Sequence, residues 1–159
     1  MAGHQVAVVM GSKSDLPIMS AALDVLREFG IEVQARVTSA HRAPDELVRF
    51  ARAAEAEGVQ VFIAGAGAAA HLPGVLAALT PVPVLGVPLA AGTLGGFDAL
   101  LSIVQMPKGV PVATFAVGGA ANAALFAVQI LSVADPELRA RFVAYKAARA
   151  REGVEILPS

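Results

Sequence analysis

The chain has 159 residues, of which 56% are hydrophobic, 16% charged and 5% aromatic, and its net charge is −1. This length suits one domain, and a charge so close to zero offers no electrostatic footprint for nucleic acid or an anionic membrane. The sequence contains no cysteine, which excludes disulfides, thiolate catalysis and cysteine-based zinc sites.

Charge is distributed unevenly along the chain. Residues 58–134 contain only two charged side chains, Asp98 and Lys108. A membrane-spanning helix needs about 20 consecutive apolar residues, but prolines, glycines and polar residues interrupt this stretch. The first five residues also lack the charged start of a signal peptide. We therefore expect a cytoplasmic protein with no membrane or nucleic-acid partner and an unusually buried middle.

Short apolar runs alternate with amphipathic or alanine-rich segments along the whole chain. The apolar runs predict strands at residues 6–10, 31–37, 59–64, 82–87 and 110–117. The other segments predict helices at residues 17–29, 44–57, 72–79, 98–105, 122–131 and 136–151.

This alternation predicts one three-layer α/β domain over residues 1–159, with a loosely held tail at 152–159. The expected architecture is a flavodoxin-like or Rossmann-like parallel sheet of about five strands, with helices on both faces. Because alanine-rich helices bury little area each, packing between subunits is a second expected source of burial. We assign the last helix to that packing.

The loop after the first strand reads Gly11-Ser12-Lys13-Ser14-Asp15. Ligands of open parallel sheets bind beyond the carboxyl ends of the strands. Small and hydroxyl-bearing residues before a helix suit a phosphate, because free backbone N–H groups and the helix dipole both favour an anion. The alternative is that Ser14 and Asp15 only cap the helix.

The loop after the second strand contains Ser39, His41 and Arg42. A loop histidine can transfer protons near neutral pH, and an arginine can bind a phosphate or carboxylate through two hydrogen bonds. The alternative is a solvated arginine beside a histidine that is bonded to the backbone.

The loop after the third strand, residues 65–74, is rich in glycine and alanine and contains His71. It matches the dinucleotide-binding pattern only loosely, since no acidic residue follows about 20 positions later. Its glycines would let the backbone approach a ligand closely, and we expect His71 to position the ligand rather than transfer a proton. The distance in sequence between His41 and His71, with no carboxylate beside His71, does not suggest a metal site. Asp98 is interpreted as the N-cap of the fourth helix.

Together these stretches resemble the class I N5-carboxyaminoimidazole ribonucleotide mutases of de novo purine synthesis. The resemblance extends over nearly the whole chain. It is carried by Met10–Asp15, Ser39–Arg42 with Pro44, Ala64–Gly67, His71–Gly74, Leu100–Pro107, Gly109–Thr114 and Asn122–Leu125.

The resemblance implies an isomerase that moves a carboxylate from the exocyclic amine of an imidazole ribonucleotide to a ring carbon, by decarboxylation and recarboxylation. His41 matches the general acid/base of the family. The positions that match its substrate-binding residues are Ser12, Ser14, Asp15, Ser39 and Arg42 for the nucleotide, and Ala66, Gly67, His71 and Leu72 around the base and the migrating carboxylate. The resemblance further implies a homo-octamer that requires no metal, ATP or organic cofactor.

Two alternatives stay open. Arg42, Pro44 and His71 favour class I over class II enzymes, which carboxylate aminoimidazole ribonucleotide directly with carbon dioxide. A relative that binds the nucleotide without turnover is the other alternative. The chain departs from the family at four positions, namely Ala43, where threonine is common, Ala68, where glycine is usual, and Ala91 and Ala99, where serine is frequent. We expect the first two departures to touch the substrate pocket.

Overall fold

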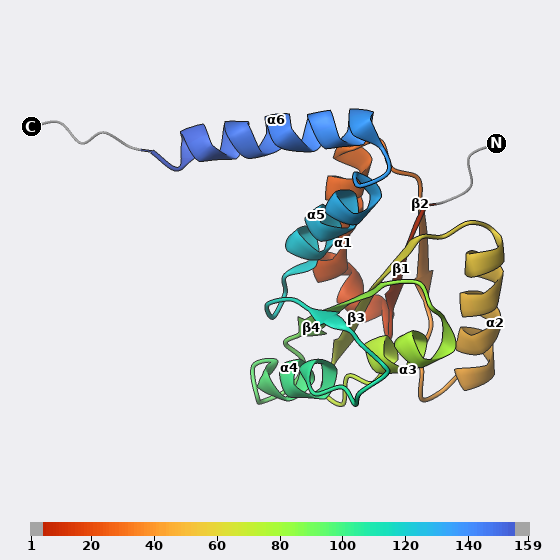
Figure 1. The fold of residues 1–159 in the computed structure, drawn as a ribbon. Helices are drawn as coiled ribbons and strands as arrows, with labels where there is room; N and C mark the ends of the chain where they lie inside the picture. Colours follow the sequence, from red (N-terminus) through yellow and green to blue (C-terminus); the bar gives the residue numbers. More distant parts are fainter. Residues whose placement is uncertain (1–4, 155–159) are drawn as a thin grey trace, which may run out of the picture.

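Figure 1 shows the computed structural model, in which residues 5–154 are described. One parallel sheet has the strand order β2-β1-β3-β4-β5. The strands are β1 (Val6–Met10), β2 (Val33–Val37), β3 (Val61–Gly67), β4 (Val84–Leu89) and β5 (Ala113–Thr114). The helices are α1 (Leu16–Glu28), α2 (Pro44–Ala56), α3 (Leu72–Leu79), α4 (Phe97–Val104), α5 (Ala120–Leu131) and α6 (Pro136–Glu152), and the 3-10 turn η1 (Lys13–Asp15) precedes α1.

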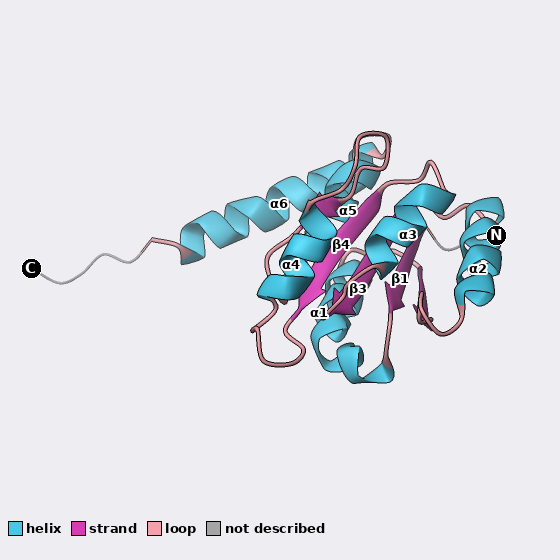
Figure 2. Cartoon of the chain, turned by 90° about the horizontal axis from the view of Figure 1, so that it is seen from below, coloured by secondary structure: helices cyan, strands magenta, loops and turns pink. Residues whose placement is uncertain are grey.

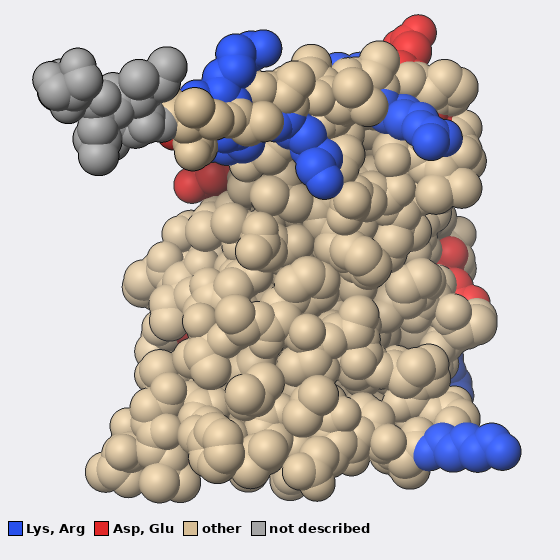
Figure 3. All heavy atoms as spheres, turned by 60° about the vertical axis from the view of Figure 1, so that its left-hand side comes forward, with Lys and Arg blue, Asp and Glu red and all other residues tan. Residues whose placement is uncertain are grey.

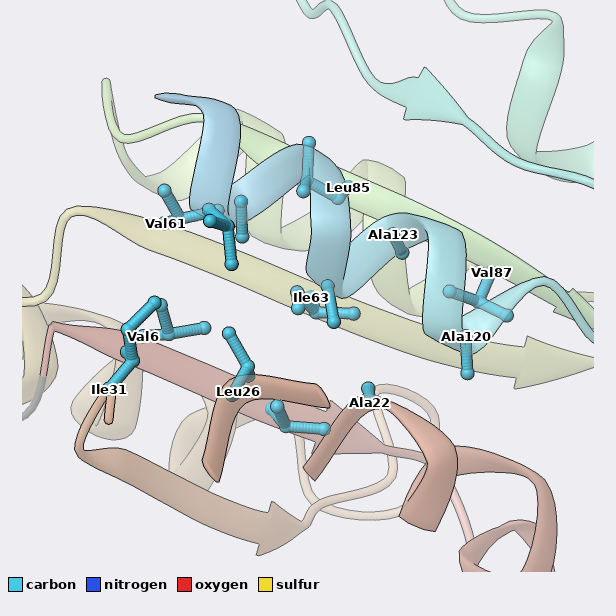
Figure 4. Packing of buried hydrophobic residues seen from close by; sticks show 14 of the residues in the cluster. Val6, Ala22, Leu26, Ile31, Val61, Ile63, Leu85, Val87, Ala120 and Ala123 are labelled. Carbon is cyan, nitrogen blue, oxygen red and sulfur yellow. The ribbon is translucent and has the colours of Figure 1, made fainter. Parts of the chain in front are cut away.

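Helices cover both faces of this sheet, which confirms the predicted three-layer α/β fold (Figure 2). Alternate residues of β1 point to opposite faces, so Val8 packs with α1 and α5 while Val9 packs with α2, α3 and α4. Figure 4 shows side chains of the strands meeting Leu26 of α1 and Ala123 of α5 within the first of these layers. Alanines on α5 allow it to lie close to both the sheet and α1.

The central strands are buried, whereas the edges of the sheet are not. Every residue of β1 and β4 is buried, as expected for strands covered on both faces. The edge strand β2 carries Gln34 and Arg36 and is partly exposed.

Three strands differ from the prediction in length. Strand β2 begins at Val33 rather than at residue 31. The fifth strand was expected at residues 110–117, but only Ala113 and Thr114 pair with β4. Pro111 has no N–H to donate, and an edge strand has a single neighbour to hold it. The third strand instead continues through Gly65 and Gly67, which were expected in a loop, because both pair with β4.

The start of α4 corrects the interpretation of Asp98. The helix begins at Phe97, and its N-cap is Gly96, whose φ of +89° favours glycine. Asp98 therefore lies in the first turn, where its Oδ1 accepts the backbone N–H of Ala99 at 2.9 Å. The carboxylate still lies at the end of the helix where the dipole favours negative charge.

Helix α6 extends beyond the rest of the molecule (Figure 1). Only Leu138 is buried along it, and Phe142 and Tyr145 contact Phe29 at the end of α1. Residues 155–159 of the predicted loose tail lie outside the described residues. Within residues 5–154, no helix has the length and apolar character needed to cross a membrane.

Candidate active site

A cleft of about 240 Å³ lies beyond the carboxyl ends of β1, β2, β3 and β4. Strands β2 and β3 lie on opposite sides of β1, so the chain reverses its direction across the sheet at this point. Open α/β sheets bind their ligands at such a reversal. The cleft is lined by Gly11, Ser12, Ser14, Asp15, Ser39, Ala40, His41, Ala66, Gly67, Ala68, Ala69, His71, Leu72 and Ala91.

All the predicted site residues except Arg42 line this cleft. Arg42 is exposed and directly follows His41, and its backbone N–H donates to Ser39 Oγ at 3.2 Å. This bond holds the backbone of Arg42 next to the cleft, but the residue does not form part of the wall. The three loops singled out in the sequence therefore meet at this cleft, although the sequence does not distinguish residues of the wall from residues beside it.

The loop after β1 is held by its own polar side chains. The backbone N–H of Ser12 donates to Asp15 Oδ2 at 2.9 Å, and Ser14 Oγ donates to Ser12 Oγ at 2.9 Å. Ser12 is the N-cap of η1 and forms a capping box with Asp15. Capping and cleft lining thus involve the same residues. Both Ser14 and Asp15 bond to Ser12, but Asp15 makes no side-chain cap on α1.

Of the residues that the structure describes, Asp15 is the only acidic one in the cleft wall. Its partial burial raises the pKa of its carboxyl group, and the hydrogen bond from the backbone of Ser12 opposes that shift. The carboxylate accepts from the loop while facing the cleft, so it can also accept hydroxyl groups of a ligand.

The loop after β2 brings His41 to the cleft. The N–H of Thr38 donates to the carbonyl of Met10 in β1 at 2.9 Å, and the N–H of Ala43 donates to the carbonyl of Ser39 at 3.0 Å. The first bond connects the start of the histidine loop to the end of β1, and the second closes a turn within the histidine loop.

His71 is the N-cap of α3 and makes direct contact with His41. Nε2 of His41 lies 2.6 Å from Nδ1 of His71, and the two rings meet edge to face at 81°. The sequence provides no signal for this contact, because the residues follow different strands. Within residues 5–154, no group of three His, Cys, Asp or Glu side chains is arranged to hold a metal ion.

The glycine-rich loop is shaped by protein contacts as well as by the open cleft. A Cβ at Gly67 would lie 2.6 Å from the Cβ of Ala91 and 3.3 Å from the carbonyl oxygen of Leu89. Gly67 therefore lets the loop after β4 approach, which brings Ala91 into the wall. Within residues 5–154, Ala68 is the only non-glycine residue with a positive φ, at +52°.

The cleft thus combines three kinds of group. Serine hydroxyls and Asp15 lie at the end of β1, two imidazoles lie opposite each other, and methyl groups line much of the rest of the wall. The methyl groups of Ala40, Ala69 and Ala91 were not predicted as part of the wall, because single alanines carry no chemical signal, whereas Ala68 was expected at the pocket. This set can bind a polar ligand at one end and transfer a proton at the other.

Known proteins are similar to this chain in both sequence and fold. Residues 5–152 match the model of a family described as AIR carboxylase. The N5-carboxyaminoimidazole ribonucleotide mutases of Mycobacterium tuberculosis and Pyrococcus abyssi are 57% and 54% identical to it over 142 residues, which is 89% of this chain and 82% of each relative. The structure of Treponema denticola PurE matches with a TM-score of 0.85 at 28% identity and covers 92% of both chains. This chain belongs to the AIR carboxylase family.

Proposed function

We propose that this protein is an N5-carboxyaminoimidazole ribonucleotide mutase of purine biosynthesis, an isomerase. The observation that carries the proposal is one cleft that contains both the Ser12–Asp15 loop and His41. The high identity to several proteins named as this mutase supports the same assignment.

In this proposal the polar loops hold the ribonucleotide. Ser12, Ser14 and Ser39 donate hydroxyl groups toward its phosphate, and Asp15 accepts from the ribose hydroxyls. Among residues 5–154, no Lys or Arg lines the wall, so the phosphate charge is met by Arg42, which lies one residue from His41.

The bond between the carboxylate and the exocyclic nitrogen is proposed to break as carbon dioxide leaves, and its electron pair on nitrogen takes a proton from His41 in its protonated form. An electron pair of the ring then forms the new bond from the ring carbon to carbon dioxide. The ring carbon then loses its proton to His41, and the electron pair of that C–H bond restores the aromatic ring. Ala66, Gly67, His71 and Leu72 surround the base and the migrating group. Their mostly apolar surface suits carbon dioxide, which is uncharged and must be kept from water until it reacts.

The assay that tests this function follows conversion of the N-carboxy nucleotide to the C-carboxy nucleotide by the purified protein, without ATP or added metal. His41→Asn should remove nearly all turnover while leaving nucleotide binding within a few-fold, because asparagine cannot act as a base. Arg52→Ser, at an exposed position of α2, is the matched control and should leave turnover unchanged. Full activity of His41→Asn would refute the role of His41.

The same samples distinguish the alternatives. A class II-like carboxylase would convert aminoimidazole ribonucleotide and carbon dioxide but not the N-carboxy nucleotide. A relative without turnover would bind the nucleotide in a calorimeter and convert neither substrate. Either result would replace the mutase assignment.

We also propose that the protein assembles with copies of itself into an octamer, as the resemblance implies. An apolar stripe on and beside α4 supports assembly, since Leu94, Phe97, Leu101 and Val104 are 37% to 62% exposed. In Figure 3 charged side chains gather near α6, and the broad surface below it carries few charges. Apolar surface of this kind marks protein contacts.

Sedimentation velocity tests the assembly. The double variant Phe97→Ser with Leu101→Ser should sediment as smaller species, whereas Arg52→Ser should sediment as the wild type does. If the wild type sediments as a monomer at micromolar concentration, the proposed octamer is wrong.

We place the reaction in the cytoplasm, because a phosphorylated nucleotide does not pass through a lipid bilayer unaided. Fractionation of cells that express a tagged protein would test this location, and recovery in the membrane or external fraction would contradict it.

A further inference from the structure

The closest contact between chemically reactive groups in the cleft is the one between its two imidazoles. Nε2 of His41 and Nδ1 of His71 are 2.6 Å apart, within the range of a short hydrogen bond. His71 is fixed at the start of α3, where its carbonyl accepts the N–H of Val75 at 2.9 Å and its own N–H donates to the carbonyl of Ala69 at 2.8 Å. The ring of His71 is therefore attached to a well-held backbone, whereas His41 belongs to an exposed turn.

A hydrogen bond between two imidazole nitrogens needs one N–H and one lone pair. Two arrangements meet this need when both rings are neutral. Either Nε2–H of His41 donates to Nδ1 of His71, or Nδ1–H of His71 donates to Nε2 of His41. In the first arrangement both rings have their hydrogen on Nε2, which is the tautomer that free neutral histidine prefers. In the second arrangement both rings take the less favoured Nδ1–H form.

We infer that His71 is a positioning residue for His41, accepting the Nε2–H of His41 through its Nδ1 and thereby holding His41 in the tautomer whose free lone pair is on Nδ1. This inference rests on the proposed function, in which His41 removes a proton from the substrate. His71 then performs for His41 the role that a carboxylate performs in a catalytic triad, fixing its tautomer and orientation.

This arrangement has a consequence for the proton-transfer step. The ring proton of the substrate is received by Nδ1 of His41, which converts that side chain to an imidazolium and leaves the C–H electrons in the aromatic ring of the product. The Nε2–H bond to the neutral His71 then becomes charge-assisted and stronger. No proton needs to leave His41 during this step, and the Nε2–H of His71 stays available to donate to the carboxylate of the substrate.

Nuclear magnetic resonance of the ring nitrogens tests the inference without any turnover. The chain has only three histidines, His4, His41 and His71, and the variants His41→Asn and His71→Ala assign two of them. At a pH where the rings are neutral, we expect both cleft histidines to carry hydrogen on Nε2. In His71→Ala the nitrogen shifts of His41 should move toward the mixed tautomers of free histidine. Hydrogen on Nδ1 of His41 in the wild type, or His41 shifts that do not change in His71→Ala, would overturn the inference.

Kinetics supplies a second readout. In His71→Ala we expect kcat to fall about 10- to 100-fold, as for the loss of a charge-assisted hydrogen bond, with a smaller change in KM. His71→Asn should recover part of this loss, because the amide oxygen of asparagine lies near the place of Nδ1 and can accept the same proton. Val75→Ala, at an exposed position of α3 outside the cleft wall, is the control and should change neither kcat nor the nitrogen shifts.

The possible failures are distinguishable. A rise in KM at constant kcat, equal in His71→Ala and His71→Asn, would mean that His71 only binds substrate. Absence of mutase activity in the wild type would overturn the proposed function, while the nitrogen spectra would still decide whether the two rings share the stated hydrogen bond.

Discussion

Ala68 offers the sharpest test of the geometry of the cleft, because its backbone occupies a region that L-residues avoid. At a φ of +52° its Cβ is crowded by the backbone, which costs about 1–2 kcal/mol for a residue other than glycine. Replacing Ala68 by Gly removes this strain but adds backbone entropy to the unfolded chain, which costs about 0.5–1 kcal/mol. The net expectation is that Ala68→Gly raises the free energy of unfolding by about 0.5–1 kcal/mol.

The neighbouring residue provides a matched control. Ala69 is also exposed in the cleft wall, but its φ is not positive. Ala69→Gly should therefore lower the free energy of unfolding by about 0.5–1 kcal/mol through entropy alone. The difference between the two variants, about 1–2 kcal/mol, isolates the strain at Ala68.

Urea titrations followed by circular dichroism measure this difference. Both variants and the wild type must be unfolded at the same protein concentration, because assembly makes apparent stability depend on concentration. If Ala68→Gly lowers the free energy of unfolding by as much as Ala69→Gly does, the argument is refuted. That result would show that the left-handed conformation carries no penalty at this position.

Three further predictions concern other parts of the chain. Burial raises the pKa of Asp15 above its ordinary value of 3.8, so between these two pKa values the folded state binds more protons than the unfolded state. The free energy of unfolding should therefore increase as the pH falls from above the pKa of Asp15 in the folded state toward its pKa in the unfolded state. It should decrease again as the pH rises. Asp15→Asn should lack this component when the free energies of unfolding of both proteins are compared from pH 7 to pH 4, and parallel curves would contradict the prediction. Thr80→Val should lower the free energy of unfolding by about 1–3 kcal/mol, because the buried hydroxyl of Thr80 donates to Glu55 at 2.8 Å and accepts the N–H of Val82 at 3.1 Å. The exposed Thr93 is its control, and an equal loss in Thr93→Val would show that these bonds contribute nothing. Gly67→Ala should reduce turnover more than stability, because its Cβ would displace the loop that carries Ala91 from the cleft wall, and unchanged kcat and KM would contradict this.

Much of the fold could be predicted from local patterns. Continuous apolar runs identified β1, β3 and β4, since strands buried on both faces select apolar residues at every position. The ends of these strands were less predictable. Glycine has no side chain to distinguish a strand from a loop, so the extension of β3 through Gly67 became visible only in its pairing with β4. The short length of β5 was likewise not predictable from its apolar run. Pro111 lies just before β5, and this edge strand pairs with only one neighbouring strand.

The candidate site was predicted as three loops that carry polar residues at the ends of consecutive strands. Their chemistry could be read from residue type, because hydroxyl groups, an imidazole and an arginine have characteristic functions in any loop. Arg42 shows the limit of that reasoning, because it has the right chemistry and lies beside His41 but does not line the cleft.

The sequence by itself determined the alternation of strands and helices, the residues available for chemistry and the resemblance to one family, because each of these depends on the identity and spacing of neighbouring residues. Only the tertiary structure decided that His41 and His71 touch, that Ala91 enters the wall and that Ala68 adopts a left-handed conformation. The physical reason is the strand order β2-β1-β3-β4-β5, which results from packing between segments distant in the chain. That packing sets distances between side chains which no local pattern encodes.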